Sequence, residues 1–139
     1  MFVARLLLLA CMAFVVGGCS FKFSIGGDPA VEDVVLSTEI DRQTSAPRNN
    51  FEAFPAGVRA IYATVEIHDL DAGEEFTFRW LKGEEVGREV DFTLDKNIRQ
   101  GWVYSSLELP EGLDSGDDYE IEVYRNGKLE TSKQFDVNE

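Results

Sequence analysis

The sequence contains few of the residues on which many enzyme sites and small exported folds depend. Its 139 residues include only two Cys, one His and four Pro, and 26 acidic side chains stand against 13 basic ones. Two Cys cannot build a disulfide-rich scaffold, and this inventory cannot assemble the usual zinc ligand sets of Cys and His. A net charge of −13 disfavours proteins that hold phosphate backbones, so nucleic acid is not an expected partner.

What the sequence does contain indicates one folded domain. Apolar residues make up 44% and aromatic residues 12%, which is too much for a disordered chain. The length suits a single domain and leaves little room for a second.

The beginning of the chain has the pattern of an export signal. Arg5 is the only charge among residues 1–18, and an apolar run follows it from Leu6 to Val16. As a helix this run would reach about 16 Å, which is short of the roughly 30 Å of a bilayer core. The pattern therefore predicts a cleaved signal peptide over residues 1–18 and not a membrane span.

The residues that close this segment carry a further motif. Val16-Gly17-Gly18-Cys19 resembles the lipobox of bacterial lipoproteins, in which an aliphatic residue and two small residues precede a Cys. The resemblance implies a diacylglyceryl thioether on Cys19, cleavage before it and acylation of the new amino terminus. Leu8-Leu9-Ala10-Cys11 fits the same pattern but leaves too short an apolar run before the cut. Ordinary secretion, with Cys19 as a free thiol, is the alternative.

Acylation would determine where the protein resides. One acyl chain binds a membrane only marginally, whereas three chains on Cys19, palmitate among them, would hold the protein there almost permanently. Ser20 follows the Cys, and by resemblance to proteobacterial lipoproteins this residue permits transfer to the outer membrane. We therefore expect a lipid-anchored protein of the cell envelope, facing the periplasm, with the outer membrane favoured.

The rest of the chain predicts an all-β domain. Residues 19–30 are expected to form the lipidated Cys and a flexible tether, and residues 31–139 to form the domain. Apolar and polar residues alternate in short runs, helical spacing is absent, and Asn126-Gly127 predicts a tight hairpin. About seven short strands separated by turns favour a single antiparallel sandwich. The expected strands are 35–40, 59–68, 75–81, a short one near residue 86, 90–94, 102–109, 119–123 and 128–137, with a long loop over 41–57.

Several of these segments resemble the immunoglobulin-like sandwich of many small exported bacterial proteins. They are Phe54-Pro55-Ala56-Gly57 before Ile61-Tyr62-Ala63, Phe78-Arg79-Trp80, Tyr119–Lys128 and Phe135-Asp136-Val137. The resemblance implies that Trp80 is the buried Trp of the third strand. It also implies that Tyr119 is a corner Tyr whose hydroxyl caps a nearby backbone group. A fold of this kind transfers no activity.

The polar residues do not indicate a catalytic or metal site. His68 is the only imidazole and is expected to be a solvated residue at a strand end. Acidic residues cluster in two predicted turns, and calcium binding or a glycosidase-like acid pair is an alternative role for them. The sequence from Asp69 resembles the start of a calcium loop, but Ala72 stands where a further Asp or Asn ligand would be needed. Solvated turns are the preferred interpretation, and no catalytic residue, metal or cofactor is predicted. The carboxylates concerned are Asp69, Asp71, Glu74, Glu75, Asp114, Asp117 and Asp118.

Four aromatic residues are expected on the polar faces of their strands, namely Tyr62, Trp102, Tyr104 and Tyr124. If they face solvent on neighbouring strands, they form a sugar-stacking or protein-binding face. Alternatively, Arg79, Arg99 or Arg125 covers the rings.

These observations favour a lipid-anchored, non-catalytic binding or spacer domain whose partner is a protein or glycan of the envelope. The alternative is an envelope inhibitor of a basic secreted enzyme, such as a lysozyme or protease, because opposite charge steers association. A polysaccharide-processing enzyme is disfavoured, since no acid–base pair stands out.

Overall fold

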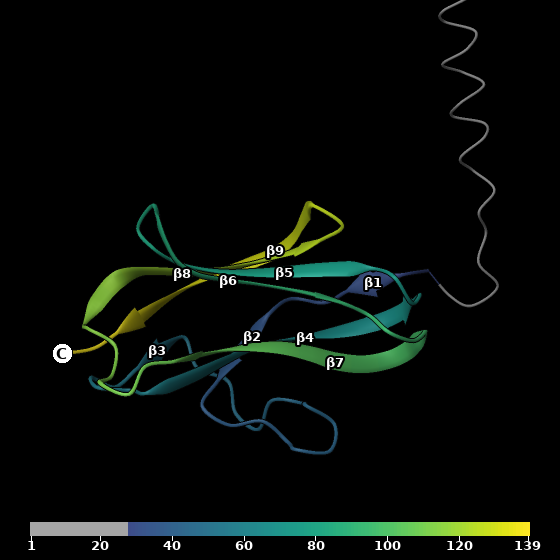
Figure 1. Cartoon of the computed structure of the whole chain (residues 1–139). Coiled ribbons are helices and arrows are strands. Elements are labelled where there is room, and N and C mark those ends of the chain that lie inside the picture. The colour runs from purple at the N-terminus through teal and green to yellow at the C-terminus, as the bar shows by residue number, and fades with distance from the viewer. Residues whose placement is uncertain (1–27) are drawn as a thin grey trace, which may run out of the picture.

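A computed structural model describes residues 28–139, which form a β-sandwich (Figure 1). Every named element of this part of the chain is a strand, so the predicted all-β class is confirmed. Cys19 and the signal region lie outside the described residues. The strands are β1 (Ala30–Val31), β2 (Val35–Ser37), β3 (Ala53–Phe54), β4 (Ala60–Leu70), β5 (Glu75–Lys82), β6 (Glu85–Thr93), β7 (Ile98–Glu108), β8 (Gly116–Arg125) and β9 (Lys128–Val137).

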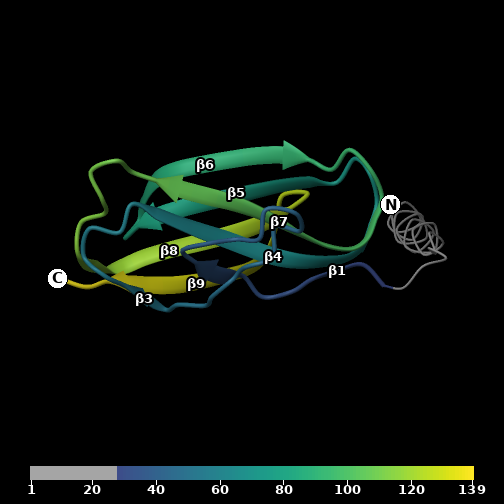
Figure 2. The ribbon, with the colours of Figure 1, turned by 90° about the horizontal axis from the view of Figure 1, so that it is seen from below.

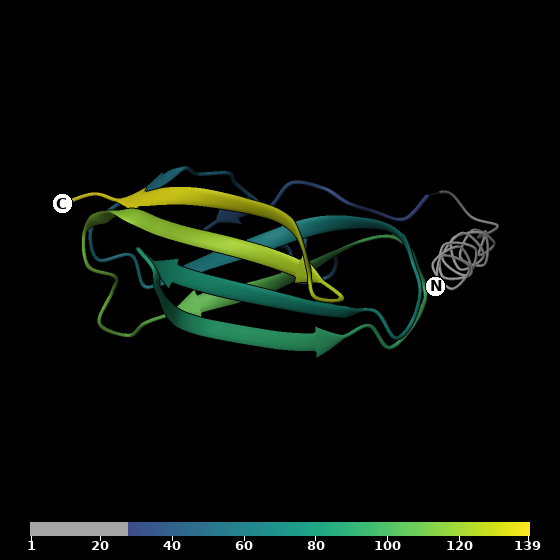
Figure 3. The same ribbon diagram turned by 90° about the horizontal axis from the view of Figure 1, so that it is seen from above.

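The strands form two sheets that face each other across the core (Figures 1 and 2). In the four-stranded sheet, β4 is central, with β1 and β2 along one side and β7 along the other. The five-stranded sheet has the order β3-β9-β8-β5-β6 and is seen from its outer side in Figure 3. All pairings are antiparallel except the short parallel contact between β3 and β9.

Alternation explains why these strands form a sandwich, since successive side chains of a strand point to opposite faces. On β4, Ile61, Ala63, Val65 and Ile67 are fully buried, and on β5 Phe76, Phe78 and Trp80 are buried. The Nε1–H of Trp80 donates a 3.1 Å hydrogen bond to the Ser105 hydroxyl on the opposite sheet. The inner faces therefore form one core, and a polar contact between the sheets satisfies the indole nitrogen.

Two local expectations are confirmed at single residues. Trp80 is buried, and the Tyr119 hydroxyl donates a 2.7 Å hydrogen bond to the Asp114 carbonyl, as expected of a corner Tyr. The chain also has positive φ at Asn126 (52°) and Gly127 (82°), as a type I′ hairpin requires. The wider resemblance to immunoglobulin-like domains stays a prediction.

Other expectations about the strands were wrong. The first strand does not run to Ile40, because β2 ends at Ser37 and Ile40 makes only an isolated bridge to Pro47. The expected loop over 41–57 contains β3, and the two strands expected around residues 86 and 90–94 are one continuous strand, β6. β3 arises from pairing with β9, which is distant in the sequence, and β6 arises from continuous pairing with its sequence neighbour β5 across a register shift between Trp80 and Leu81. Alternation within a segment reports neither pairing.

Candidate functional site

Three of the four predicted aromatic residues lie together on the outer face of the four-stranded sheet. Tyr62 belongs to β4, and Trp102 and Tyr104 belong to β7, where Tyr104 is paired with Thr64 and Trp102 with Glu66. The rings of Tyr62 and Tyr104 have centroids 6.0 Å apart and planes inclined at 58°. Tyr104 is 42% exposed and Tyr62 is partly buried, so the tilted pair presents one exposed ring and one partly exposed ring.

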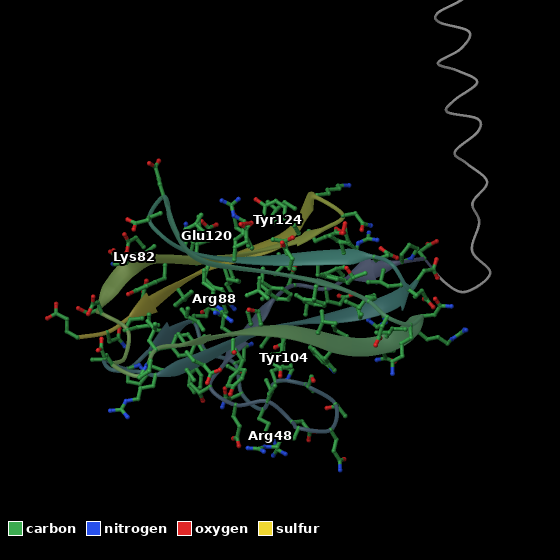
Figure 4. The ribbon with its side chains drawn as sticks, in the orientation of Figure 1. Arg48, Lys82, Arg88, Tyr104, Glu120 and Tyr124 are labelled. Atoms are coloured by element: carbon green, nitrogen blue, oxygen red, sulfur yellow. The ribbon has the colours of Figure 1, made fainter. Side chains whose placement is uncertain are left out.

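Tyr124 lies on the other sheet, so the four aromatic residues do not form one face (Figure 4). Its ring is covered by the Arg79 guanidinium, whose carbon lies 5.8 Å from the ring centroid. Its hydroxyl donates to Glu122 at 3.1 Å and accepts from Arg79 at 3.4 Å. The expectation of a single patch of four is wrong, because alternation sets the face of a strand but not the sheet that the strand joins. The alternative that Arg79 covers a ring is correct here.

A loop between β2 and β3 forms a wall beside the tyrosine pair. The loop is held as a hairpin by an Ile40–Pro47 bridge and by backbone hydrogen bonds from Asp41 to Ala46 (2.8 Å) and from Arg48 to Glu39 (2.9 Å). Its base is fastened by Asn49, whose side-chain oxygen accepts from the Thr38 N–H at 2.9 Å. The wall is therefore ordered by its own contacts.

Asp41 organises the tip of this loop. Its carboxylate accepts the backbone N–H groups of Gln43 (2.8 Å) and Thr44 (3.0 Å) and pairs with Arg48 at 3.2 Å. The hydrogen bond from the Thr44 N–H, followed by that from Gln43, holds the pKa of Asp41 below its ordinary value of 3.8. The carboxylate is thus ionised, and holds the turn, at neutral pH.

The tyrosine pair and the loop enclose a cleft of about 840 Å³, which we call the tyrosine cleft. Figure 4 shows Tyr104 and Arg48 on this side of the molecule. A smaller hollow of about 370 Å³ adjoins it, sharing Ser45 and Tyr104 and reaching Trp102 and Phe92. The tyrosine cleft is lined by Thr38, Glu39, Ile40, Asp41, Arg42, Gln43, Ser45, Arg48, Tyr62 and Tyr104.

The remaining candidate residues have structural surroundings. His68 is partly exposed, with Nε2 at 3.8 Å from Glu66 and 3.9 Å from Glu32. Glu74, expected in a solvated turn, instead accepts from Arg125 at 2.6 Å and is mostly buried. Within residues 28–139 no group of three or more His, Cys, Asp or Glu residues is placed to hold a metal ion.

Sequence reasoning did not identify the wall residues Glu39, Arg42 and Arg48. One signal was present, because an Asp followed by Arg-Gln-Thr suits a turn in which the carboxylate caps the next backbone N–H groups. That pattern indicates an ordered loop, but it does not show which sheet face the loop covers. In the described residues no helix has the length and apolar character needed to cross a membrane.

No protein-family model matches the chain, and no curated protein matches it. Among solved structures, the fold is similar to part of the Pseudomonas fluorescens alkylpurine DNA glycosylase AlkC bound to DNA containing an abasic site analog. The TM-score is 0.45 and the identity 12%, over 83% of this chain and 32% of the glycosylase. The chain thus matches about a third of that protein's length, and a likeness this distant gives no ground for assigning an activity.

Proposed function

We propose that the protein is a lipid-anchored cell-envelope protein whose sandwich is a non-catalytic binding domain. The observation that supports the anchor is Val16-Gly17-Gly18-Cys19, placed directly after an apolar run that Arg5 precedes. Three acyl chains on Cys19 hold the protein to a membrane far more firmly than one chain does. Ser20 favours the outer membrane by the same resemblance.

The tyrosine cleft is the observation that supports a binding role. Its wall is ordered before any ligand arrives, so little conformational entropy is lost on binding. Its floor is the exposed ring of Tyr104 beside the partly exposed ring of Tyr62, and its wall contributes convergent polar groups, a combination typical of ligand sites. β1, the first described strand, and the C-terminus lie toward opposite ends of the sandwich (Figure 1). The cleft lies on the side between them, so a tether at the first end leaves it accessible.

Mass spectrometry of the protein purified from cells tests the anchor. We expect an amino terminus at Cys19 with attached acyl chains, and we expect Cys19→Ser to leave the protein unacylated and released from membranes. Cys11→Ser is the matched control and should remain anchored. Recovery of an unmodified peptide that still contains residues 1–18 would contradict the proposal.

A second candidate function is inhibition of a basic secreted enzyme, and the net charge of −13 favours it. Binding of this kind depends on attraction between charges, which salt screens. The Debye length falls from about 8 Å at physiological salt to about 3 Å at 1 M, so the binding should weaken steeply as the salt concentration rises. Titration of the protein into a cationic lysozyme at low and high salt separates the two functions. Salt-sensitive inhibition that survives Tyr104→Ala supports the inhibitor. No inhibition at low salt rejects it.

A further inference from the structure

Two side chains in the wall of the tyrosine cleft remain free to bind a ligand. Glu39 and Arg42 line the cleft, are exposed, and form no ion pair or side-chain hydrogen bond with any other residue of 28–139. Asp41 and Arg48, by contrast, are paired with each other at 3.2 Å. The cleft therefore offers an unpaired acceptor and an unpaired donor, with Gln43 beside them.

These groups select for a ligand with hydroxyl groups. An ionised carboxylate only accepts hydrogen bonds and a guanidinium only donates them, whereas one hydroxyl does both. A ligand with adjacent hydroxyl groups satisfies Glu39 and Arg42 together. Apolar groups have little to pack against in the wall, because Ile40 is its only aliphatic residue.

The charge of the lining disfavours ionic ligands. Two acidic residues, Glu39 and Asp41, balance two basic residues, Arg42 and Arg48, in a molecule whose net charge is −13. The lining itself is neutral and gives neither a cation nor an anion a net attraction, while the field of the whole molecule repels an anion and attracts a cation. The local balance therefore favours an uncharged, polar ligand.

The floor suits a saturated ring. Aromatic faces carry negative charge density, so the polarised C–H groups on one side of a sugar ring are attracted to them. The rings of Tyr62 and Tyr104 both line the cleft with planes inclined at 58°, and the volume of about 840 Å³ is within the usual range for ligand sites. A sugar ring can stack on Tyr104 while its hydroxyl groups face the wall.

The adjoining hollow extends this surface around the edge of β7, where Val103 and Phe92 of β6 also line it. Trp102 lies two residues from Tyr104 on the same face, which corresponds to about 7 Å along a strand. Because Tyr104 borders both hollows, a ligand in the cleft can continue over Trp102. The arrangement suits a chain of linked rings better than a single small molecule.

We propose that the tyrosine cleft binds an uncharged glycan, with sugar rings on Tyr62 and Tyr104 and hydroxyl groups on Glu39 and Arg42. The proposal rests on the binding function proposed above and names its ligand class. A peptide partner is the competing occupant, and it is an outcome of the test below.

The test is titration of the full-length protein in detergent micelles with neutral hexasaccharides of glucose, mannose and N-acetylglucosamine, followed by calorimetry and NMR. We expect at least one to bind with a Kd of about 1 mM or tighter. Tyr104→Ala should weaken binding about tenfold or more. Tyr104→Phe should retain it, because the ring face is kept, and Tyr124→Ala is the matched control on the other sheet, with no expected change.

A separate variant tests the wall. Glu39→Gln keeps the size of its side chain and Arg42→Gln shortens its side chain, and together they remove both charges; we expect weaker binding with unchanged stability. Polygalacturonate serves as the anionic comparison and should bind more weakly than the neutral sugars.

The proposal is overturned if no neutral hexasaccharide binds at millimolar concentration, or if binding is insensitive to Tyr104→Ala. Stronger binding of polygalacturonate, or a peptide partner that alone competes at Tyr104, overturns it as well. Such results leave the proposed anchor intact, because acylation of Cys19 is measured independently. Absence of acylation would reject the anchor and leave the glycan test unaffected.

Discussion

The outer faces of the two sheets use similar residues in different ways. On the outer face of the five-stranded sheet, Tyr124, Arg79 and Glu122 contact one another, although Arg79 Nε is buried without a hydrogen-bond partner in residues 28–139. At the end of β8, Arg125 is held by Glu74 at 2.6 Å and by Glu130 at 2.7 Å. On the four-stranded sheet, Tyr104 keeps an exposed ring beside the partly exposed Tyr62, and the nearby wall keeps unpaired polar groups. Polar side chains that pair with one another contribute to stability, and exposed polar side chains that are left unpaired are suited to recognition.

Among the variants that test this comparison, Arg125→Met is expected to lower the free energy of unfolding most. The change leaves two carboxylates, each with 18% of its side chain exposed, close together without their shared cation. We expect the free energy of unfolding to fall by about 2 kcal/mol, measured by urea denaturation. Arg88→Met on β6 is the matched control, and it should change stability by no more than about 0.5 kcal/mol. Equal losses of unfolding free energy in both variants would show that the ion pairs of Arg125 with Glu74 and Glu130 do not stabilise the fold.

A second change should expose the ring of Tyr124 to solvent. Arg79→Ala removes the guanidinium from the Tyr124 ring, and we expect a stability loss of about 1 kcal/mol. Tyrosine nitration followed by peptide mass spectrometry should show Tyr104 reacting before Tyr124 in the wild type, and both reacting similarly in the variant. If Tyr124 reacts as fast as Tyr104 in the wild type, the contrast between the faces fails.

Low pH should loosen the wall of the cleft. The pKa of Asp41 is lowered in the folded protein, so its stabilising contribution is fully present above the ordinary value of 3.8. That contribution is lost as the pH falls through the lowered pKa. The amide resonances of Gln43 and Thr44 should shift together with a midpoint below 3.8, and Asp41→Asn should abolish this titration. A midpoint above 3.8 would contradict the capped turn.

The smallest effects are expected at two buried hydroxyl groups under the loop. Ser37 Oγ is buried and has no hydrogen-bond partner in residues 28–139, whereas the Thr64 hydroxyl donates to the Val35 carbonyl at 3.2 Å. We expect Ser37→Ala to be neutral or slightly stabilising and Thr64→Val to cost about 1 kcal/mol. Thermal unfolding measures both, and a larger loss from Ser37→Ala would show that its hydroxyl is satisfied.

Local pattern predicted much of the fold. Alternation placed Tyr62 and Tyr104 outward and Trp80 inward, and β9 spans the predicted range of Lys128–Val137 residue for residue. The Asn126-Gly127 turn also formed as expected, since Asn and Gly readily adopt the positive φ that the turn requires. These features are decided by neighbours in the sequence.

Features decided by distant neighbours were not predicted. Glu74 and Arg125 are 51 residues apart, and the placement of Tyr124 depends on which sheet β8 joins. The cleft needs the loop after β2 to fold over β4 and β7, and no periodicity within residues 38–50 encodes that contact. Pairing across the sheets therefore creates the candidate site.

The central claim is that the outer face of the four-stranded sheet around Tyr104 is the binding face of the protein. Photo-crosslinking in growing cells tests it most directly. A photoreactive phenylalanine is placed at position 104 in one strain and at position 124 in another. We predict crosslinked envelope material from position 104 and none from position 124. Equal crosslinking from both positions, or crosslinking from position 124 alone, would contradict the account.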